Sequence, residues 1–131
     1  ELELVRHLGE IALAQGDLAL ARTHFRSAFV TSRELGNQHE IVLCLEAVAL
    51  LLIRNGSHAR AAHLLGASDT LRQAIATPRT HDSGEHYRAS LATCGDALGE
   101  AAAATAFAAG LASTSEQAIA DAFAWIDHPS A

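Results

Sequence analysis

Residues 8–28 read LGEIALAQGDLALARTHFRSA, and they contain two amphipathic helical patterns joined by a short turn at Gly16. Gly9 on the first pattern and Ala21 on the second lie at the expected crossing of the two helices, and Phe25 follows Ala21 by one turn. Small residues at such a crossing let two helix axes come within about 8–10 Å of each other. The stretch therefore predicts an antiparallel helical hairpin.

The composition extends this expectation to the whole chain. The chain has 131 residues, the size of one domain, and 50% of them are apolar. Alanine dominates the apolar residues and aromatic residues are few, which favours a core built from close helix–helix contacts. We therefore expect residues 1–131 to form a single all-α domain.

Helical spacing of apolar residues recurs along the chain and predicts seven helices. Their expected bounds are about residues 2–15, 18–35, 39–54, 58–76, 85–98, 100–110 and 114–126.

An internal repeat links the two halves of the first four helices. A shift of 40 residues superposes Gly16 on Gly56, Ala21 on Ala61 and Phe25 on Leu65. The sequence therefore predicts two repeats followed by closing helices, over about residues 2–36, 38–76 and 85–126.

The first repeat resembles a tetratricopeptide (TPR) repeat, whose signature is W-x2-L-G-x2-Y followed by A-x3-F. Valine stands in place of the Trp and alanine in place of the Tyr, and the matching residues are Val5, Leu8, Gly9, Ala12, Ala21 and Phe25. The resemblance implies a TPR-like α-solenoid of antiparallel helix hairpins, in which the first helix of each hairpin lines a concave groove.

The second half is similar to the closing segment of TPR regions in large multidomain bacterial transcriptional regulators. These regulators carry an NTPase module and often a DNA-binding domain of LuxR or antibiotic-regulator type. The similarity lies in Leu64–Ala67, Leu71-Arg72, Ala76–Arg79, Tyr87, Ala97–Gly99 and Ser115–Ala118. It implies a non-catalytic, cytoplasmic segment for protein–protein interaction or regulation, which binds a protein, a peptide or another domain of the same chain.

Two other functions stay open at this point. A small-ligand sensor would have its pocket between the repeats and the closing helices, and a closed apolar cavity lined by Phe25, Leu65 and Tyr87 would favour it. An open groove of mixed charge would favour protein binding. A fragment of an enzyme ranks lowest, because neither G-x-S-x-G nor H-E-x-x-H occurs.

The resemblance also implies which residues would line the groove. They are Glu3, Arg6, Glu10 and Leu13 in the first repeat, and Leu43, Glu46, Leu50 and Arg54 in the second. TPR domains that bind acidic C-terminal tails clamp the carboxylate with Lys and Asn, whereas this chain has Arg6 and Glu10 there, so an acidic tail is not expected. The alternative is that these residues form a solvated face that packs on neighbouring repeats.

Charge and composition exclude several classes of partner. The net charge of −6 argues against direct nucleic-acid binding by this segment. No apolar run reaches about 18 residues, so no membrane-spanning helix is expected. A phosphate-binding P-loop needs lysine, and all nine cationic residues counted as Lys or Arg are arginine. We expect no cofactor.

Residues 81–86, HDSGEH, combine two histidines with two acids and raise the question of a metal site. Pro78 and Gly84 indicate a loop here, with Asp82 or Ser83 as the N-cap of the following helix. We favour the capping interpretation over a metal site, because no fuller set of ligands is evident.

Other local signals predict where helices start and stop and whether the cysteines are paired. Asp17 is an expected N-cap and Gly36 an expected helix stop, and Ser113 with Glu116 forms an expected capping box. Cys44 and Cys94 lie in apolar helical patterns, so we expect free buried thiols rather than a disulfide.

The N-terminus begins inside a helical pattern and the sequence contains no Met, which suggests a piece of a longer protein. No polar capping helix precedes the first helix. We therefore expect its face carrying Leu4 and Ile11 to be partly bare in the isolated chain, and to be covered by a partner such as a second copy, forming a homodimer.

Overall fold

The computed structural model describes residues 2–128, and within them it has seven α-helices and no strand. The all-α prediction and the number of helices are confirmed. In chain order the helices are α1 (Leu2–Ala14), α2 (Leu18–Leu35), α3 (Gln38–Arg54), α4 (His58–Ala74), α5 (His81–Leu98), α6 (Glu100–Leu111) and α7 (Ser115–Asp127).

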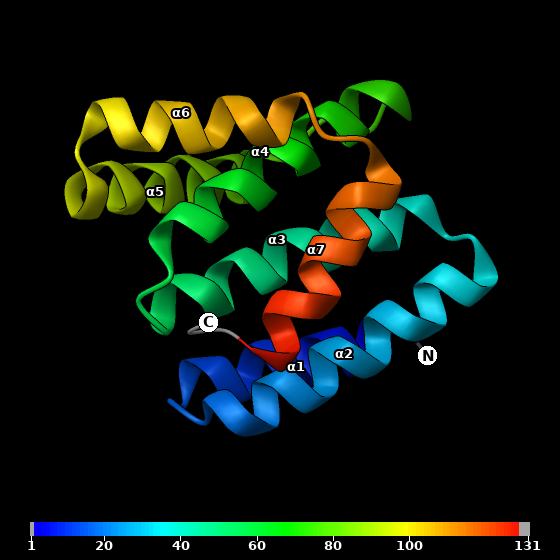
Figure 1. The fold of residues 1–131 in the computed structure, drawn as a ribbon. Coiled ribbons are helices and arrows are strands. Elements are labelled where there is room, and N and C mark those ends of the chain that lie inside the picture. The colour runs from blue at the N-terminus through cyan, green and yellow to red at the C-terminus, as the bar shows by residue number, and fades with distance from the viewer. Residues whose placement is uncertain (1, 129–131) are drawn as a thin grey trace.

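The first six helices form three hairpins, α1–α2, α3–α4 and α5–α6 (Figure 1). The first helices of successive hairpins contact each other, because α3 touches both α1 and α5. The second helix of one hairpin also packs on the next hairpin, as in the contacts of α2 with α3 and of α4 with α5 and α6. The arrangement of these hairpins as a TPR-like α-solenoid remains a prediction.

Helix α7 does not extend this series. It runs back across α3 and contacts α2, α3 and α4 (Figure 1). Phe123 packs on Phe29 with the ring centroids 5.0 Å apart, and the guanidinium of Arg33 lies 4.6 Å from the Phe123 centroid. Ile126 is fully buried at the end of the helix. The chain therefore folds back on its first two hairpins.

The first hairpin has the crossing that the sequence predicts. A Cβ atom placed on Gly9 would lie 2.5 Å from Cε1 of Phe25, so any larger residue at this position would force the buried Phe25 ring to shift. Phe25 and Ala21 are fully buried on α2. Asp17 caps α2, since its side chain accepts a hydrogen bond of 3.1 Å from the backbone N–H of Leu20.

A second close crossing joins α4 and α6. A Cβ on Gly110 would lie 1.8 Å from the carbonyl oxygen of His63, and one on Gly66 would lie 2.2 Å from that of Phe107. Glycine inside a helix usually lowers its stability. Here the missing side chains bring the two backbones into contact, which explains how alanine-rich α6 packs closely on α4 with few large residues.

Two predicted N-caps were wrong. Helix α5 begins at His81 rather than near Glu85, because Thr80 is the N-cap and accepts a hydrogen bond of 3.1 Å from the backbone N–H of Ser83. Neither Asp82 nor Ser83 is the cap; both lie in the first turn of the helix. Thr is also a preferred capping residue, although it ranks below Asp and Ser, and Thr80 stands closest to the preceding proline.

The cap of α7 is displaced by one residue. Thr114 rather than Ser113 is the N-cap, and its hydroxyl accepts a hydrogen bond of 3.1 Å from the backbone N–H of Gln117. Thr114 and Gln117 have the same capping-box spacing as Ser113 and Glu116, so sequence alone could not choose between them.

Both thiols are free and fully buried, as predicted. None of the helices in residues 2–128 combines the length and the apolar character that a membrane span requires.

Candidate functional site: a groove lined by α1, α3 and α5

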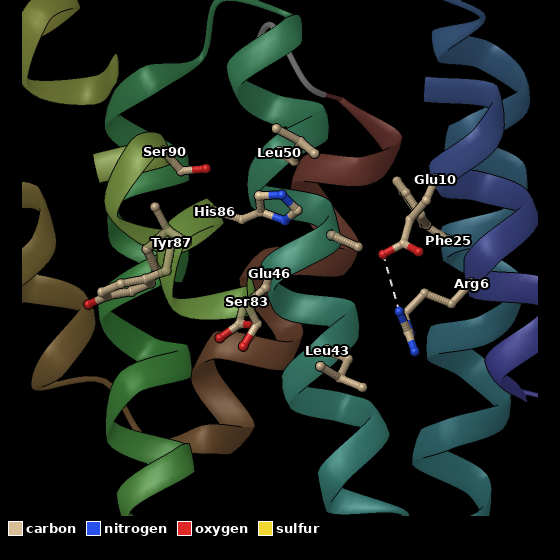
Figure 2. A pocket seen from close by; sticks show the side chains of 12 residues that line it. Arg6, Glu10, Phe25, Leu43, Glu46, Leu50, Ser83, His86, Tyr87 and Ser90 are labelled. Carbon is tan, nitrogen blue, oxygen red and sulfur yellow. Dashed lines mark hydrogen bonds and ion pairs between the residues drawn. The ribbon is translucent and has the colours of Figure 1, made fainter. Parts of the chain in front are cut away.

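The faces of α1, α3 and α5 meet around a cavity of about 200 Å³ that is open rather than enclosed (Figure 2). Helix α5 forms one wall, α1 forms the opposite wall, and α3 runs between them. The lining residues are Arg6, Glu10, Phe25, Leu43, Glu46, Ala47, Leu50, Leu65, Ser83, His86, Tyr87 and Ser90. We refer to this site as the groove.

The groove follows the 40-residue repeat of the chain. Glu46 on α3 lies 40 residues after Arg6 on α1 and 40 residues before His86 on α5. The other lining residues are related in the same way, as in the pairs Glu10–Leu50, Leu50–Ser90, Leu43–Ser83, Ala47–Tyr87 and Phe25–Leu65. Equivalent positions on the first helices of three hairpins therefore face one groove, and the 40-residue relationship extends to α5.

Five of the eight groove residues predicted from the resemblance line the cavity. These five are Arg6, Glu10, Leu43, Glu46 and Leu50.

The other three predicted groove residues lie outside the cavity, and Leu13 is the clearest error. Glu3 and Arg54 are exposed beyond its ends, whereas Leu13 is 1% exposed and belongs to the core. Arg54 covers this end of α1 by donating a hydrogen bond of 3.2 Å to the carbonyl oxygen of Leu13. An apolar residue in the last turn of α1 is therefore packing, not a contact for a partner.

The wall formed by α5 was missed by the sequence analysis. From the sequence, Ser83 is expected as an N-cap and His86 and Ser90 are given no place in the groove, because α5 is expected to start near Glu85 and no third repeat is expected. A second application of the 40-residue shift to Leu43 would have pointed to Ser83.

Arg6 is held from two sides. It is 8% exposed and forms ion pairs with the buried Glu40 on α3 and with Glu10 on its own helix, the latter at 3.1 Å. Burial opposes the charge of Arg6, but the hydrogen bond and attraction of Glu40 outweigh burial, so the pKa of Arg6 is raised. This guanidinium ties α1 to α3.

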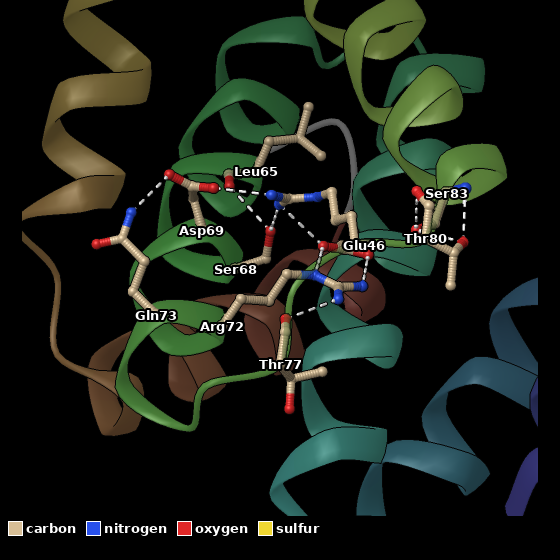
Figure 3. A network of polar contacts seen from close by, with 10 residues as sticks. Glu46, Leu65, Ser68, Asp69, Arg72, Gln73, Thr77, Thr80 and Ser83 are labelled. Carbon is tan, nitrogen blue, oxygen red and sulfur yellow. Dashed lines mark hydrogen bonds and ion pairs between the residues drawn. The ribbon is translucent and has the colours of Figure 1, made fainter.

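Glu46 is fixed in the floor of the groove by two arginines from outside it (Figure 3). Arg72 on α4 donates two hydrogen bonds of 2.8 Å to the two carboxylate oxygens of Glu46. Arg79 adds a third of 3.1 Å, and also donates to Asp69 at 2.7 Å and to the hydroxyl of Ser68 at 3.2 Å. Two acids and two arginines thus form a closed network between α3, α4 and the start of α5.

Tyr87 joins this network to α5. The guanidinium carbon of Arg79 lies 3.5 Å from the centroid of the Tyr87 ring, a cation–π contact. Burial raises the pKa of Tyr87 to about 12; the charge of Asp69 and, less strongly, that of Glu46 act in the same direction, while Arg79 opposes the shift. The phenol therefore stays neutral and serves to hold α5 in place.

The described residues contain no cluster suited to a metal ion, and the thiol of Cys44 is not activated. His81 and Glu85 form an exposed ion pair of 2.8 Å on α5, but no group of three or more His, Cys, Asp or Glu residues within 2–128 could hold a metal ion. Burial raises the pKa of Cys44 to about 12, with Glu40 adding to the shift, so its thiol stays protonated.

Comparison of the chain with protein-family models gives no match, and neither the curated proteins nor the solved structures give a significant one.

Proposed function

We propose that this chain is a non-catalytic protein–protein interaction or regulatory segment that binds a partner in the groove. The observation that carries the proposal is that three successive hairpins turn equivalent positions toward one open groove of mixed charge (Figure 2). A groove built from repeated positions suits a chain that crosses several repeats. The partner is another protein, a peptide or another domain of the same chain.

The sequence resemblance supports a more specific assignment as a TPR-like segment of a cytoplasmic bacterial transcriptional regulator. In support of it, Phe25 of the A-x3-F pattern lies directly against Gly9 of the L-G pattern. The two arginine-tied acids Glu40 and Glu46 hold α3 against α1 and against α4–α5. A groove of fixed shape needs such rigid walls.

A small-ligand sensor is the second candidate, because Phe25, Leu65 and Tyr87 do line the cavity. Two features count against it. The cavity of about 200 Å³ is smaller than the usual range for ligand pockets, about 300–1,000 Å³. It is also partly open, and its mostly apolar lining includes the charged side chains of Arg6, Glu10 and Glu46. An enzyme fragment remains the lowest candidate.

A selection with displayed peptides tests the proposal. A library of random 12-residue peptides is selected on the wild-type chain, and the enriched peptides are then tested for binding to the Leu50→Glu variant. This substitution places a negative charge at a half-exposed position of α3 that lines the groove. Leu35→Glu is the matched control, because Leu35 is exposed on α2 outside the groove. We expect peptides that bind the wild type and Leu35→Glu but not Leu50→Glu.

Two results would count against this function. One is a set of enriched peptides that bind all three proteins equally. The other is a small molecule retained by the purified chain in native mass spectrometry and lost in Leu50→Glu, which would favour the sensor.

A further inference from the structure

We infer that the groove recognises a partner segment that brings a cation to Glu10 and an apolar side chain to Leu50, and that it disfavours acidic segments. This inference rests on the proposed function and names the chemical class of its partner.

The arginines at the groove are already paired with acids of their own chain. Arg6 contacts both Glu40 and Glu10, and Arg72 and Arg79 share Glu46, with Asp69 also bound to Arg79. The carboxylate of a partner would have to displace one of these acids. The Arg6–Glu40 pair and the network around Glu46 are mostly buried and costly to separate, and the more exposed Glu10 would repel a second carboxylate. The arginines at the groove therefore offer an acidic partner no ready contact.

The charge left over at the groove is negative and lies on the α1 wall. One arginine, Arg6, faces two carboxylates there, those of Glu40 and Glu10, whereas the network around Glu46 balances two acids with two arginines. Glu10 is the accessible member, since its side chain is 42% exposed. Its second oxygen has only a distant contact, 3.8 Å from Nε2 of the exposed His7.

Equivalent positions on the three helices that line the groove carry different types of side chain. Glu10 on α1, Leu50 on α3 and Ser90 on α5 are equivalent by the 40-residue shift and all three line the groove (Figure 2). The order across the groove is thus acid, apolar side chain and hydroxyl. Leu43 and Ala47 extend the apolar strip of α3.

A partner segment lying across the three helices would meet these chemistries in that order. A basic side chain would pair with Glu10, an apolar one would cover the α3 strip, and a polar one would face Ser90 and His86. Electrostatic complementarity of this kind sets which partners are accepted.

The test uses the peptides that depend on the groove, defined as those whose binding is lost in Leu50→Glu and kept in Leu35→Glu. Their affinities are measured for the wild type, for Glu10→Gln and for Glu34→Gln. Glutamine at position 10 keeps an oxygen that can accept from Arg6. Glu34→Gln is the matched control, because it changes the net charge equally at an exposed position of α2 outside the groove.

We expect the groove-dependent peptides to be rich in Arg or Lys together with Leu-like residues. Their affinity should fall about threefold in Glu10→Gln and stay unchanged in Glu34→Gln. Thermal melts of the variants establish that both are folded.

The outcomes separate this inference from the proposed function. Groove-dependent peptides that are acidic or neutral, or that are insensitive to Glu10→Gln, would overturn the inference and leave the groove as a binding site. An equal loss in Glu10→Gln and Glu34→Gln would show an effect of net charge alone and would also overturn it. If no peptide depends on the groove, the proposed function fails as well.

Discussion

Gly110 on α6 rests directly on the backbone of His63 on α4, so closely that a Cβ on the glycine would lie 1.8 Å from the carbonyl oxygen of the histidine. A carbonyl of a helix cannot move aside as the end of a flexible side chain can. The second and third hairpins are therefore in contact through backbone atoms. The backbones of α4 and α6 can approach this closely only because Gly110 has no side chain.

Replacing Gly110 with alanine should lower the free energy of unfolding by about 3 kcal/mol, at the upper end of the range for overpacking. Gly95→Ala is the matched control: Gly95 also lies in a helix, α5, but nothing lies within 4 Å of a Cβ placed there. That change should stabilise the chain by up to about 1 kcal/mol, because alanine is the better helix former. Urea denaturation followed by circular dichroism measures both values. Equal effects of the two changes would mean that α4 and α6 are not in backbone contact.

Neutralising Glu46 should be costly because it leaves two arginines without their shared acid. Arg72 is 5% exposed, and a buried charge that loses its partner typically costs about 3–5 kcal/mol. For Glu46→Gln we expect a loss near 3 kcal/mol, since the amide still has one oxygen that can accept. Glu85→Gln is the control, because it breaks the exposed pair with His81 and should change stability by less than about 0.5 kcal/mol. If the two variants unfolded at the same denaturant concentration, the network would not hold α5.

The pKa of Cys44 predicts how stability depends on alkaline pH. In the folded chain it is about 12, raised from 9.0, so the thiol of the unfolded chain ionises first as the pH rises. The contribution of Cys44 is therefore complete below about pH 9 and is lost progressively up to about pH 12. Tyr87, raised from 10.0 to about 12, adds a loss in the same direction that begins about one pH unit higher. Urea denaturation between pH 8 and 11 should show this decline, and it should be shallower in Cys44→Ala.

The reactivity of the two cysteines toward a thiol reagent tests their burial directly. At pH 8 the folded chain should react very slowly, and both cysteines should react at once in denaturant. A rapidly reacting thiol in the folded chain would contradict the burial of Cys44 and Cys94.

The exposed apolar side chains on the outer face of α1 predict that two copies of the chain associate. Leu4, Leu8 and Ile11 are 58%, 41% and 54% exposed, so the bare apolar face expected from the sequence is confirmed. Contiguous apolar surface of this kind usually marks a contact site. Sedimentation should show a concentration-dependent rise in mass that is lost when Leu4 and Ile11 are both changed to Gln. A monomer at every concentration would show that this face does not bind a second copy.

The sequence predicted the elements whose signals are local and unambiguous. Examples are the Gly9–Phe25 crossing, the Asp17 cap and the buried thiols. In each case the residue types are compatible with few other local structures. The starts of α5 and α7 were misplaced because several adjacent residues are of capping type, and the caps used, Thr80 and Thr114, are not the highest-ranked among them.

The groove was only half predictable, for a physical reason. The TPR resemblance predicts that α1 and α3 line the groove. The contribution of α5 depends on that helix beginning at His81, because only then do Ser83 and His86 lie on a helix face. Nor could sequence reveal that Arg6 and Glu46 are already paired, because their partners Glu40, Arg72 and Arg79 lie 26 to 34 residues away in the chain. Those pairings decide which charges remain available to a partner.

Binding in the groove is measured most directly by the backbone amide chemical shifts of the chain, recorded as a groove-dependent peptide is added. We expect the largest shifts on the groove faces of α1, α3 and α5, at Glu10, Leu43, Leu50, Ser83, His86 and Ser90. Shifts confined to the outer face of α1 around Leu4 and Ile11, or to the contact of α7 with α2, would contradict binding in the groove.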